Sequence, residues 1–370
     1  MSAKPRRWWP VVKALLGLAI LGAVGWRFGQ DLGRPELYEH AIRWPWLVLA
    51  AGLYLVGMSL SAVYWHRLMG HLGASPGFAA SMRTYFIATL GKYVPGKAMA
   101  LVMRIGMMRA EGVSAFIAGK TTFCEVLTTM ASGTILAVGL FILFGPVAPA
   151  ANLWETVTAL VRLDLSPDHP IDGWALVVVC LGLSAITLGP IFPPFVNLIA
   201  ARLSIRPVPK LRMRWLIGGL AQIMPAWVLM GVGLACAFQA IPGAELPWTL
   251  PVLGRLTAIM GLSYVAAFLL WTPGGLGVRE FLLGLLLAPE LAGRGDEVWV
   301  AGRVVLAVLL LRVAWTVAEL LAAGALYWVR VSPHIRVSEP EAQARNTVTL
   351  ACASGSEESS PPSKGMAANP

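Results

Sequence analysis

Charged side chains are scarce in this sequence. They make up 13% of its 370 residues, whereas an ordinary soluble domain contains about 25%. Hydrophobic residues make up 57% of the chain, and several apolar runs reach the roughly 20 residues that a helix requires to cross a bilayer. These proportions argue against a soluble enzyme or binding domain and predict a polytopic membrane protein.

Cysteine and histidine are also rare, with four and five residues respectively. Cys124, Cys180 and Cys236 lie inside apolar runs and Cys352 lies near the C-terminus, so their spacing predicts neither a disulfide framework nor a metal site. The sequence contains no glycine-rich loop of the P-loop type and no recognisable pairing of a nucleophile with a base. We therefore expect no cofactor, no bound metal and no catalytic residue.

Acidic residues are the scarcer of the two charge signs, which gives a formal net charge of +10. The segment 202–214 is basic throughout and contains no acid, and 65–71 carries a basic cluster after an apolar run. The positive-inside rule predicts that such segments are cytoplasmic, and we expect His66 and His71 to lie at the membrane interface. Anionic lipid headgroups therefore explain the basic character more simply than nucleic acid does.

The apolar runs predict an all-α fold. We expect a polytopic helical membrane bundle of about seven or eight transmembrane helices. Residues 1–9 would be a basic cytoplasmic N-terminus, 10–330 the transmembrane domain, and 331–370 a disordered polar tail. A cleaved signal peptide is the alternative for the first run, but Lys13 interrupts its apolar region. The predicted spans cover residues 10–25, 46–64, 113–144, 174–200, 216–238, 253–271 and 301–329.

Two segments rich in proline and glycine interrupt the apolar pattern, at 91–97 and 271–280. Proline lacks a backbone N–H and glycine permits backbone angles that other residues avoid, so a membrane helix is expected to break there. Each break is either a loop between two spans or part of a discontinuous, re-entrant element whose freed backbone groups contact a polar ligand. The residues that define the breaks are Pro95, Gly96, Pro273, Gly274, Gly275 and Gly277.

The two breaks divide the chain into similar halves. Each half contains two spans, a broken charged element and a long span that holds an acidic residue, and the 174–200 span joins the halves. This order predicts an internal repeat of the kind found in transporters, whose binding sites lie where discontinuous helices meet. The charged stretch 81–110 predicts an interfacial helix followed by a re-entrant segment.

Several ionisable residues lie within or beside the apolar runs. A charge at the bilayer centre costs about 2.5–3.5 kcal/mol even on the lowest scales, so such a group is expected to face the protein interior and to have a partner. Arg312 and Glu319 are seven residues apart and share one helix face, whereas Arg303 points to the opposite side. The candidate substrate-binding residues are Lys92, Lys97, Arg104, Glu125, Arg279, Glu280, Arg312 and Glu319.

Two interpretations of these charges stay open. Either the cations and carboxylates pair to hold the bundle together, or they line a polar pathway for a charged headgroup. In the second case Arg279, Arg312 and Lys97 would hold a phosphate group, since arginine binds phosphate through a bidentate fork. The glutamates of the set would orient these cations or meet a cationic headgroup.

Two motifs resemble those of a known membrane family. The segment Leu90-Gly-Lys-Tyr-Val-Pro-Gly-Lys97, with Arg104 downstream, is similar to the first family motif. Thr272-Pro-Gly-Gly-Leu-Gly-Val-Arg-Glu280 is similar to the second, more specific motif. The family is the flippase-like family of the lysylphosphatidylglycerol synthase transmembrane region, which includes the membrane half of the multiple peptide resistance factor. The resemblance covers residues 10–330 and implies a helical domain that moves lipids between leaflets.

The sequence departs from the family pattern at two places. Ala98 and Met99 follow Lys97 where the family commonly has a Gly-Glu pair, and Glu125 is followed by apolar and threonine residues rather than by arginine and aspartate. The headgroup preference that the resemblance implies therefore need not apply here. The family's soluble synthase domain, which transfers lysine from aminoacyl-tRNA, has no counterpart in this sequence, so we do not expect aminoacyl-phospholipid synthesis by this chain alone.

We expect an inner-membrane protein that translocates a lipid or a lipid-linked polar group between leaflets, with both termini in the cytoplasm. Membrane lipids are the expected partners, and a gradient or mass action would supply the driving force. One alternative is a membrane enzyme on a lipid-linked substrate that uses Glu125 or Glu280 as a base. Another is a non-transporting membrane partner of a separate envelope lipid or glycan synthase.

Overall fold

The computed structural model describes residues 42–93, 99–144, 211–269 and 278–328. These ranges contain eight α-helices and two short 3-10 helices, and no strand occurs in them, which confirms the predicted all-α class for this part of the chain. The helices are α2 (Trp44–His71), α3 (Phe78–Thr89), η2 (Leu90–Tyr93), α4 (Met99–Ala110), α5 (Ala115–Phe144), α9 (Met213–Gln239), α10 (Leu250–Leu269), α11 (Val278–Leu287), η4 (Ala288–Leu291) and α12 (Glu297–Trp328).

Five of these helices are long and apolar enough to cross a membrane, namely α2, α5, α9, α10 and α12. Each corresponds to one of the predicted spans. The other two predicted spans, at 10–25 and 174–200, lie outside the described residues, so the total of about seven or eight crossings stays a prediction.

The helix ends differ from the prediction where local chemistry extends a helix. The helix α2 continues past residue 64 to His71, and the chain turns only at Gly73, whose φ of 83° suits glycine. The side chain of Trp65, just beyond the predicted end of this span, is fully buried beside Tyr85. The helix α12 begins at Glu297 because an Asp296 carboxylate oxygen accepts the backbone N–H of Trp299 at 2.8 Å.

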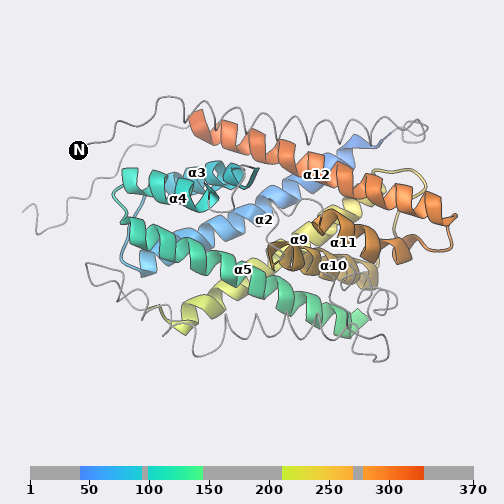
Figure 1. The fold of residues 1–370 in the computed structure, drawn as a ribbon, viewed down its shortest axis with the longest axis horizontal. Helices are drawn as coiled ribbons and strands as arrows, with labels where there is room; N and C mark the ends of the chain where they lie inside the picture. The colour runs from blue at the N-terminus through green and yellow to red at the C-terminus, as the bar shows by residue number, and fades with distance from the viewer. Residues whose placement is uncertain (1–41, 94–98, 145–210, 270–277, 329–370) are drawn as a thin grey trace, which may run out of the picture. The chain divides into compact units, whose positions relative to one another are not determined.

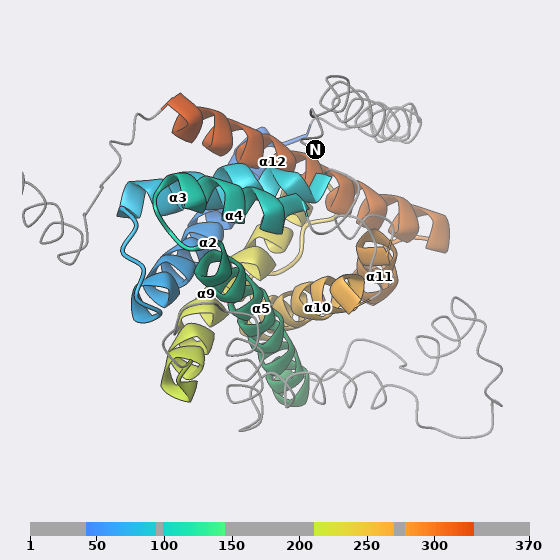
Figure 2. The same ribbon diagram turned by 60° about the vertical axis from the view of Figure 1, so that its left-hand side comes forward.

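The long helices pack around α9, which contacts α2, α5, α10 and α12 (Figures 1 and 2). The helix α12 also packs against α2 and α3, and α5 packs against α10. Each of the two long helices that carry an acid, α5 and α12, therefore contacts an element from the other half of the chain. This packing brings the two predicted broken elements into the same helix bundle.

Small residues allow the closest helix contacts. A Cβ added at Gly219 of α9 would overlap the ring of Tyr64 in α2, and one added at Gly231 would overlap Thr257 in α10. Close backbone approach at glycine is a usual way for membrane helices to pack, since burial of apolar surface gives little driving force within lipid. These contacts fix the rotation of α9, and with it the faces that its neighbours present.

The predicted broken elements are flanked by short helices. In the first, α3 and α4 pack against each other, with η2 ending at Tyr93 and α4 beginning at Met99. In the second, α10 ends at Leu269 and α11 begins at Val278. The residues predicted to cause the breaks, which are Pro95, Gly96, Pro273, Gly274, Gly275 and Gly277, lie outside the described residues, as does Lys97.

Candidate functional site

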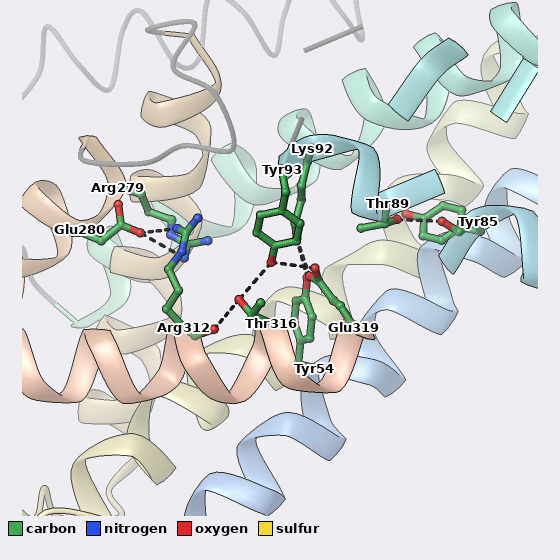
Figure 3. Close-up of polar contacts among 10 residues, drawn as sticks. All are labelled: Tyr54, Tyr85, Thr89, Lys92, Tyr93, Arg279, Glu280, Arg312, Thr316 and Glu319. Atoms are coloured by element: carbon green, nitrogen blue, oxygen red, sulfur yellow. Dashed lines mark hydrogen bonds and ion pairs between the residues drawn. The ribbon is translucent and has the colours of Figure 1, made fainter. Parts of the chain in front are cut away.

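A polar cluster surrounds the carboxylate of Glu319 in α12, whose side chain is 1% exposed. The hydroxyl of Tyr54 in α2 and the ammonium of Lys92 in η2 both donate to one oxygen of this carboxylate. The hydroxyl of Tyr93 donates to the other oxygen at 2.9 Å and lies 3.1 Å from the hydroxyl of Thr316 (Figure 3). We call Tyr54, Lys92, Tyr93, Thr316 and Glu319 the Glu319 cluster.

Three elements that are distant in the sequence form this cluster: α12 supplies the carboxylate, and α2 and η2 supply the donors that it requires. A buried carboxylate is tolerated when an opposite charge and hydrogen bonds occupy its lone pairs. The helices α2 and α12 pack together and present one tyrosine and one glutamate, while η2 follows directly after α3 and adds a lysine and a second tyrosine. The cluster therefore ties the first predicted break to the last long helix.

A second cluster lies at the start of α11. The guanidinium of Arg312 in α12 and that of Arg279 both donate to the same carboxylate oxygen of Glu280, the latter at 3.4 Å (Figure 3). Aromatic rings cover the Arg279 guanidinium, with the ring centroid of Tyr264 at 4.6 Å and that of Trp315 at 5.7 Å. We call Arg279, Glu280 and Arg312, with Tyr264 and Trp315, the Glu280 cluster.

A third cluster occupies the first half of the chain. The guanidinium of Arg104 in α4 donates to Glu125 in α5 at 2.8 Å, and the hydroxyl of Tyr85 in α3 donates to the same carboxylate at 3.0 Å. The Arg104 guanidinium lies over the ring of Tyr85 at 4.1 Å and that of Trp65 at 5.1 Å. Both ends of the ion pair are buried. We call these four residues the Glu125 cluster.

Aromatic stacking joins the Glu319 and Glu280 clusters along α12. The ring of Tyr54 stacks on Trp315 with centroids 4.5 Å apart, and Trp315 lies 6.4 Å from the ring of Tyr264. On the helix itself, the hydroxyl of Thr316 donates to the backbone carbonyl of Arg312 at 2.9 Å. One face of α12 thus carries an arginine, a threonine and a glutamate in sequence, bordered by aromatic rings.

The sequence of this chain matches a known family over most of its length. The profile of the lysylphosphatidylglycerol synthase TM region matches residues 14–302.

The chain belongs to this family.

It is accordingly an integral, multi-pass membrane protein of a flippase-like family. A search of curated proteins finds no match. The matched region contains the Glu125 cluster and the Arg279–Glu280 pair, whereas Arg312 and Glu319 lie beyond its end.

Seven of the eight predicted site residues lie in the described part of this family member, and all seven belong to the three clusters. Arg312 and Glu319 are both buried and point toward the broken elements, as their shared helix face predicts. Their partners differ, however, because Arg312 pairs with Glu280 and Glu319 pairs with Lys92. Among the described residues, no group of three His, Cys, Asp or Glu is arranged to hold a metal ion.

Sequence reasoning missed the aromatic partners of the charged residues. Tyr54, Tyr85 and Tyr93 donate to buried carboxylates, and Tyr264 covers a guanidinium. The chain has only seven tyrosines, and in membrane proteins this residue usually collects at the interfaces. A tyrosine within an apolar span, such as Tyr54 or Tyr264, was the available signal that a buried polar group needs a partner.

Proposed function

We propose that this protein translocates a lipid, or a lipid-linked polar group, between membrane leaflets. The observation that carries the proposal is the burial of three cation–carboxylate clusters among helices that are otherwise apolar. Ionisable groups inside a membrane domain are costly and usually mark a pathway for a substrate or ion. The three clusters also flank the two predicted breaks, where transporters commonly bind their substrates.

The polar face of α12 is the proposed path of the headgroup. Arg312, Thr316 and Glu319 follow one another along this face, and the neighbouring rings of Tyr54, Trp315 and Tyr264 lie beside it. A headgroup that exchanges hydrogen bonds with these side chains would keep polar partners throughout its transfer, while its acyl chains stay in the bilayer. A gradient or mass action would drive the net movement.

The arrangement of the clusters supports an internal repeat. In each half, an arginine from a short helix lies beside a glutamate and over two aromatic rings, as seen for Arg104 and for Arg279. We therefore propose that the halves are related transporter repeats. We further propose an inner-membrane location with the N-terminus and the C-terminal tail in the cytoplasm, based on the basic segments of the sequence.

Catalysis and scaffolding are the competing functions. A base on a lipid-linked substrate requires a carboxylate with an accessible lone pair, yet Glu125 and Glu280 already accept hydrogen bonds from arginine. We therefore propose transport without chemical change of the lipid. A membrane partner of a separate envelope lipid or glycan synthase would co-purify with that enzyme and move no lipid alone.

Reconstitution in vesicles tests the proposal. The vesicles would carry fluorescent lipids, and the fraction of label that an impermeant quencher reaches over time would report translocation. We expect the wild-type protein to move lipid and Arg312→Ala to abolish the movement, whereas Arg255→Ala should keep it. Arg255 is the matched control, because it forms an ion pair with Glu290 at 2.5 Å that belongs to none of the three clusters.

Folding must be verified for each variant by monodisperse elution and helical circular dichroism. Normal movement by a folded Arg312→Ala variant would exclude the proposed headgroup path. Absence of movement by folded wild-type protein would favour the enzyme or the scaffold. Mass spectrometry of the recovered lipid would then separate these two, since only an enzyme leaves a changed product.

A further inference from the structure

Arg279 is a buried cation with poor pairing. Its side chain is 8% exposed, and its hydrogen-bonded carboxylate oxygen, on Glu280, lies 3.4 Å away. Charge-assisted bonds of this type are normally about 2.7–2.9 Å long. The same carboxylate oxygen also accepts a hydrogen bond from Arg312. In addition, the Nε–H of Arg279 is buried and has no acceptor among the residues that the structure describes. A guanidinium has five N–H donors, so Arg279 retains donors for a further anion.

Two other cations that pair with carboxylates near the breaks, Arg104 and Lys92, are better paired. Arg104 also has an Nε–H without an acceptor in the described part of the chain, but its guanidinium donates to Glu125 at 2.8 Å, a normal length for such a pair. The ammonium of Lys92 donates to Glu319 in a cluster that two tyrosine hydroxyls complete. Among these three cations, Arg279 therefore has the greatest capacity to bind an additional ligand.

The residues around Arg279 favour a ligand of negative charge. The guanidinium lies over the rings of Tyr264 and Trp315. In the absence of Arg279, aromatic rings of this kind could bind a cationic headgroup. The protein's own cation thus occupies the position that a ligand cation would take. The N–H donors of the guanidinium lie along its edge, and this edge matches the oxygens of a phosphate.

The backbone at this position favours an anion as well. Arg279 lies in the first turn of α11, a helix of ten residues. The first four N–H groups of a helix have no partner within the helix, and its dipole is positive at this end. Phosphate groups are commonly bound at such helix starts, and here the under-paired Arg279 adds a charged donor to them.

We propose that Arg279 and Arg312 form a binding site for the phosphate of an anionic lipid headgroup, and that Glu280 occupies this site until the headgroup displaces it. This inference rests on the proposed function and names the substrate class for it. Glu280 is a carboxylate shared by two guanidiniums, so a phosphate that takes its place would gain two bidentate partners. Glu280 therefore competes with the lipid.

Substitutions on the two sides of the pair should act in opposite directions. Arg279→Gln removes a charged donor and should lower affinity for anionic lipid about tenfold or more, the usual effect of losing a hydrogen bond to a charged group. Arg279→Lys keeps the charge without the planar fork and should fall between this variant and the wild type. Glu280→Gln removes the competing charge and should raise the affinity. A purely structural ion pair would give no gain for Glu280→Gln.

Native mass spectrometry of the purified full-length protein in detergent measures this affinity directly. The probes are phosphatidylglycerol, phosphatidylcholine and a cationic ethyl-phosphatidylcholine with the same acyl chains. Inorganic phosphate is added as a competitor to separate a lipid headgroup from a free phosphate. Arg255→Gln is the matched control, since it alters an ion pair with Glu290 outside the site.

The expected result is a preference for phosphatidylglycerol that weakens in Arg279→Gln, strengthens in Glu280→Gln and is unchanged in Arg255→Gln. Equal binding of the three lipids, or a preference that Arg279→Gln leaves intact, would overturn the site. Competition by inorganic phosphate at equal concentration would reassign it to free phosphate. Vesicle translocation tests the proposed function separately. If the protein binds anionic lipid selectively but moves no lipid, transport is refuted and the site is retained. If it moves lipid but binds the three lipids equally, the site is refuted and transport is retained.

Discussion

The carboxylate of Glu319 should contribute more to stability than any one of its donors. Each donor supplies one hydrogen bond, and such a bond within a membrane bundle contributes about 0.6 kcal/mol on average and about 1.7 kcal/mol at most. We therefore expect Tyr54→Phe and Tyr93→Phe each to lower the free energy of unfolding by an amount in this range. Both hydroxyls donate to the Glu319 carboxylate, which makes them a matched pair.

Glu319→Ala should cost more, because it leaves the ammonium of Lys92 without its carboxylate. Removal of one partner of a buried ion pair typically costs about 3–5 kcal/mol. We expect the lower end of this range, since the Lys92 side chain is 30% exposed and can rearrange. The double variant Lys92→Met with Glu319→Leu leaves no unpaired charge, so it should be more stable than Glu319→Ala alone.

Unfolding by sodium dodecyl sulfate in mixed micelles, followed by circular dichroism, would measure these free energies. The exposed pair of Arg43 and Glu245 is the control, and Arg43→Ala should change stability by no more than about 1 kcal/mol. Two results would contradict this expectation: a double variant as unstable as Glu319→Ala, or a Glu319→Ala variant that loses less stability than Tyr54→Phe. Either result would mean that the ion pair does not determine the stability of this cluster.

Two further predictions concern helix packing and pH. Gly219→Ala should lower the free energy of unfolding by about 1–3 kcal/mol, because its Cβ would overlap the ring of Tyr64. Gly218→Ala, with no atom within 4 Å of its Cβ, should be neutral or stabilising; equal effects in the same micelles would contradict the α2–α9 contact. The pKa of Glu245 lies below its ordinary value because backbone N–H groups, followed by Arg43, stabilise its carboxylate. The stabilisation that the Glu245 carboxylate provides is therefore fully present above its pKa in the unfolded state, about 4.3. It is lost as pH falls through the lower pKa of the folded state. The stability difference between wild type and Glu245→Gln should shrink below pH 4 or so; a constant difference would contradict this.

Local sequence pattern was sufficient to predict the five long helices of the described ranges and one polar helix face. The spans followed from apolar length, and the shared face of Arg312 and Glu319 followed from a separation of seven residues. Helix ends were less accurate, because they depend on single groups such as the carboxylate of Asp296 or the positive φ of Gly73. These groups affect only the last turn of a helix and do not change the pattern of apolar residues.

The identity of each charge partner could not be predicted from the sequence. Glu319 pairs with Lys92, 227 residues earlier, and Arg312 pairs with Glu280 rather than with a glutamate on its own helix. Periodicity determines which face of a helix is polar, but the neighbouring helix is determined by packing. That packing depends on contacts such as that of Gly219 with Tyr64, which no regularity of the sequence reveals.

The buried charges can hold the helix bundle together or bind a headgroup. Glu319 fits the first role and Arg279 fits the second. Replacement of a buried ion pair by apolar residues is often neutral or stabilising, so pairing alone does not explain why charges occur here. Glu319 accepts hydrogen bonds from three donors and joins η2 to α12, which suits a residue that holds the helices in place. Arg279 has a long hydrogen bond to a shared carboxylate and a donor without an acceptor among the described ranges, which suits a residue that binds a ligand. The two roles are separable by experiment, because Arg279→Gln leaves Glu280 paired with Arg312. It should therefore lower lipid affinity with little loss of stability, whereas substitution of Glu319 should lower stability first.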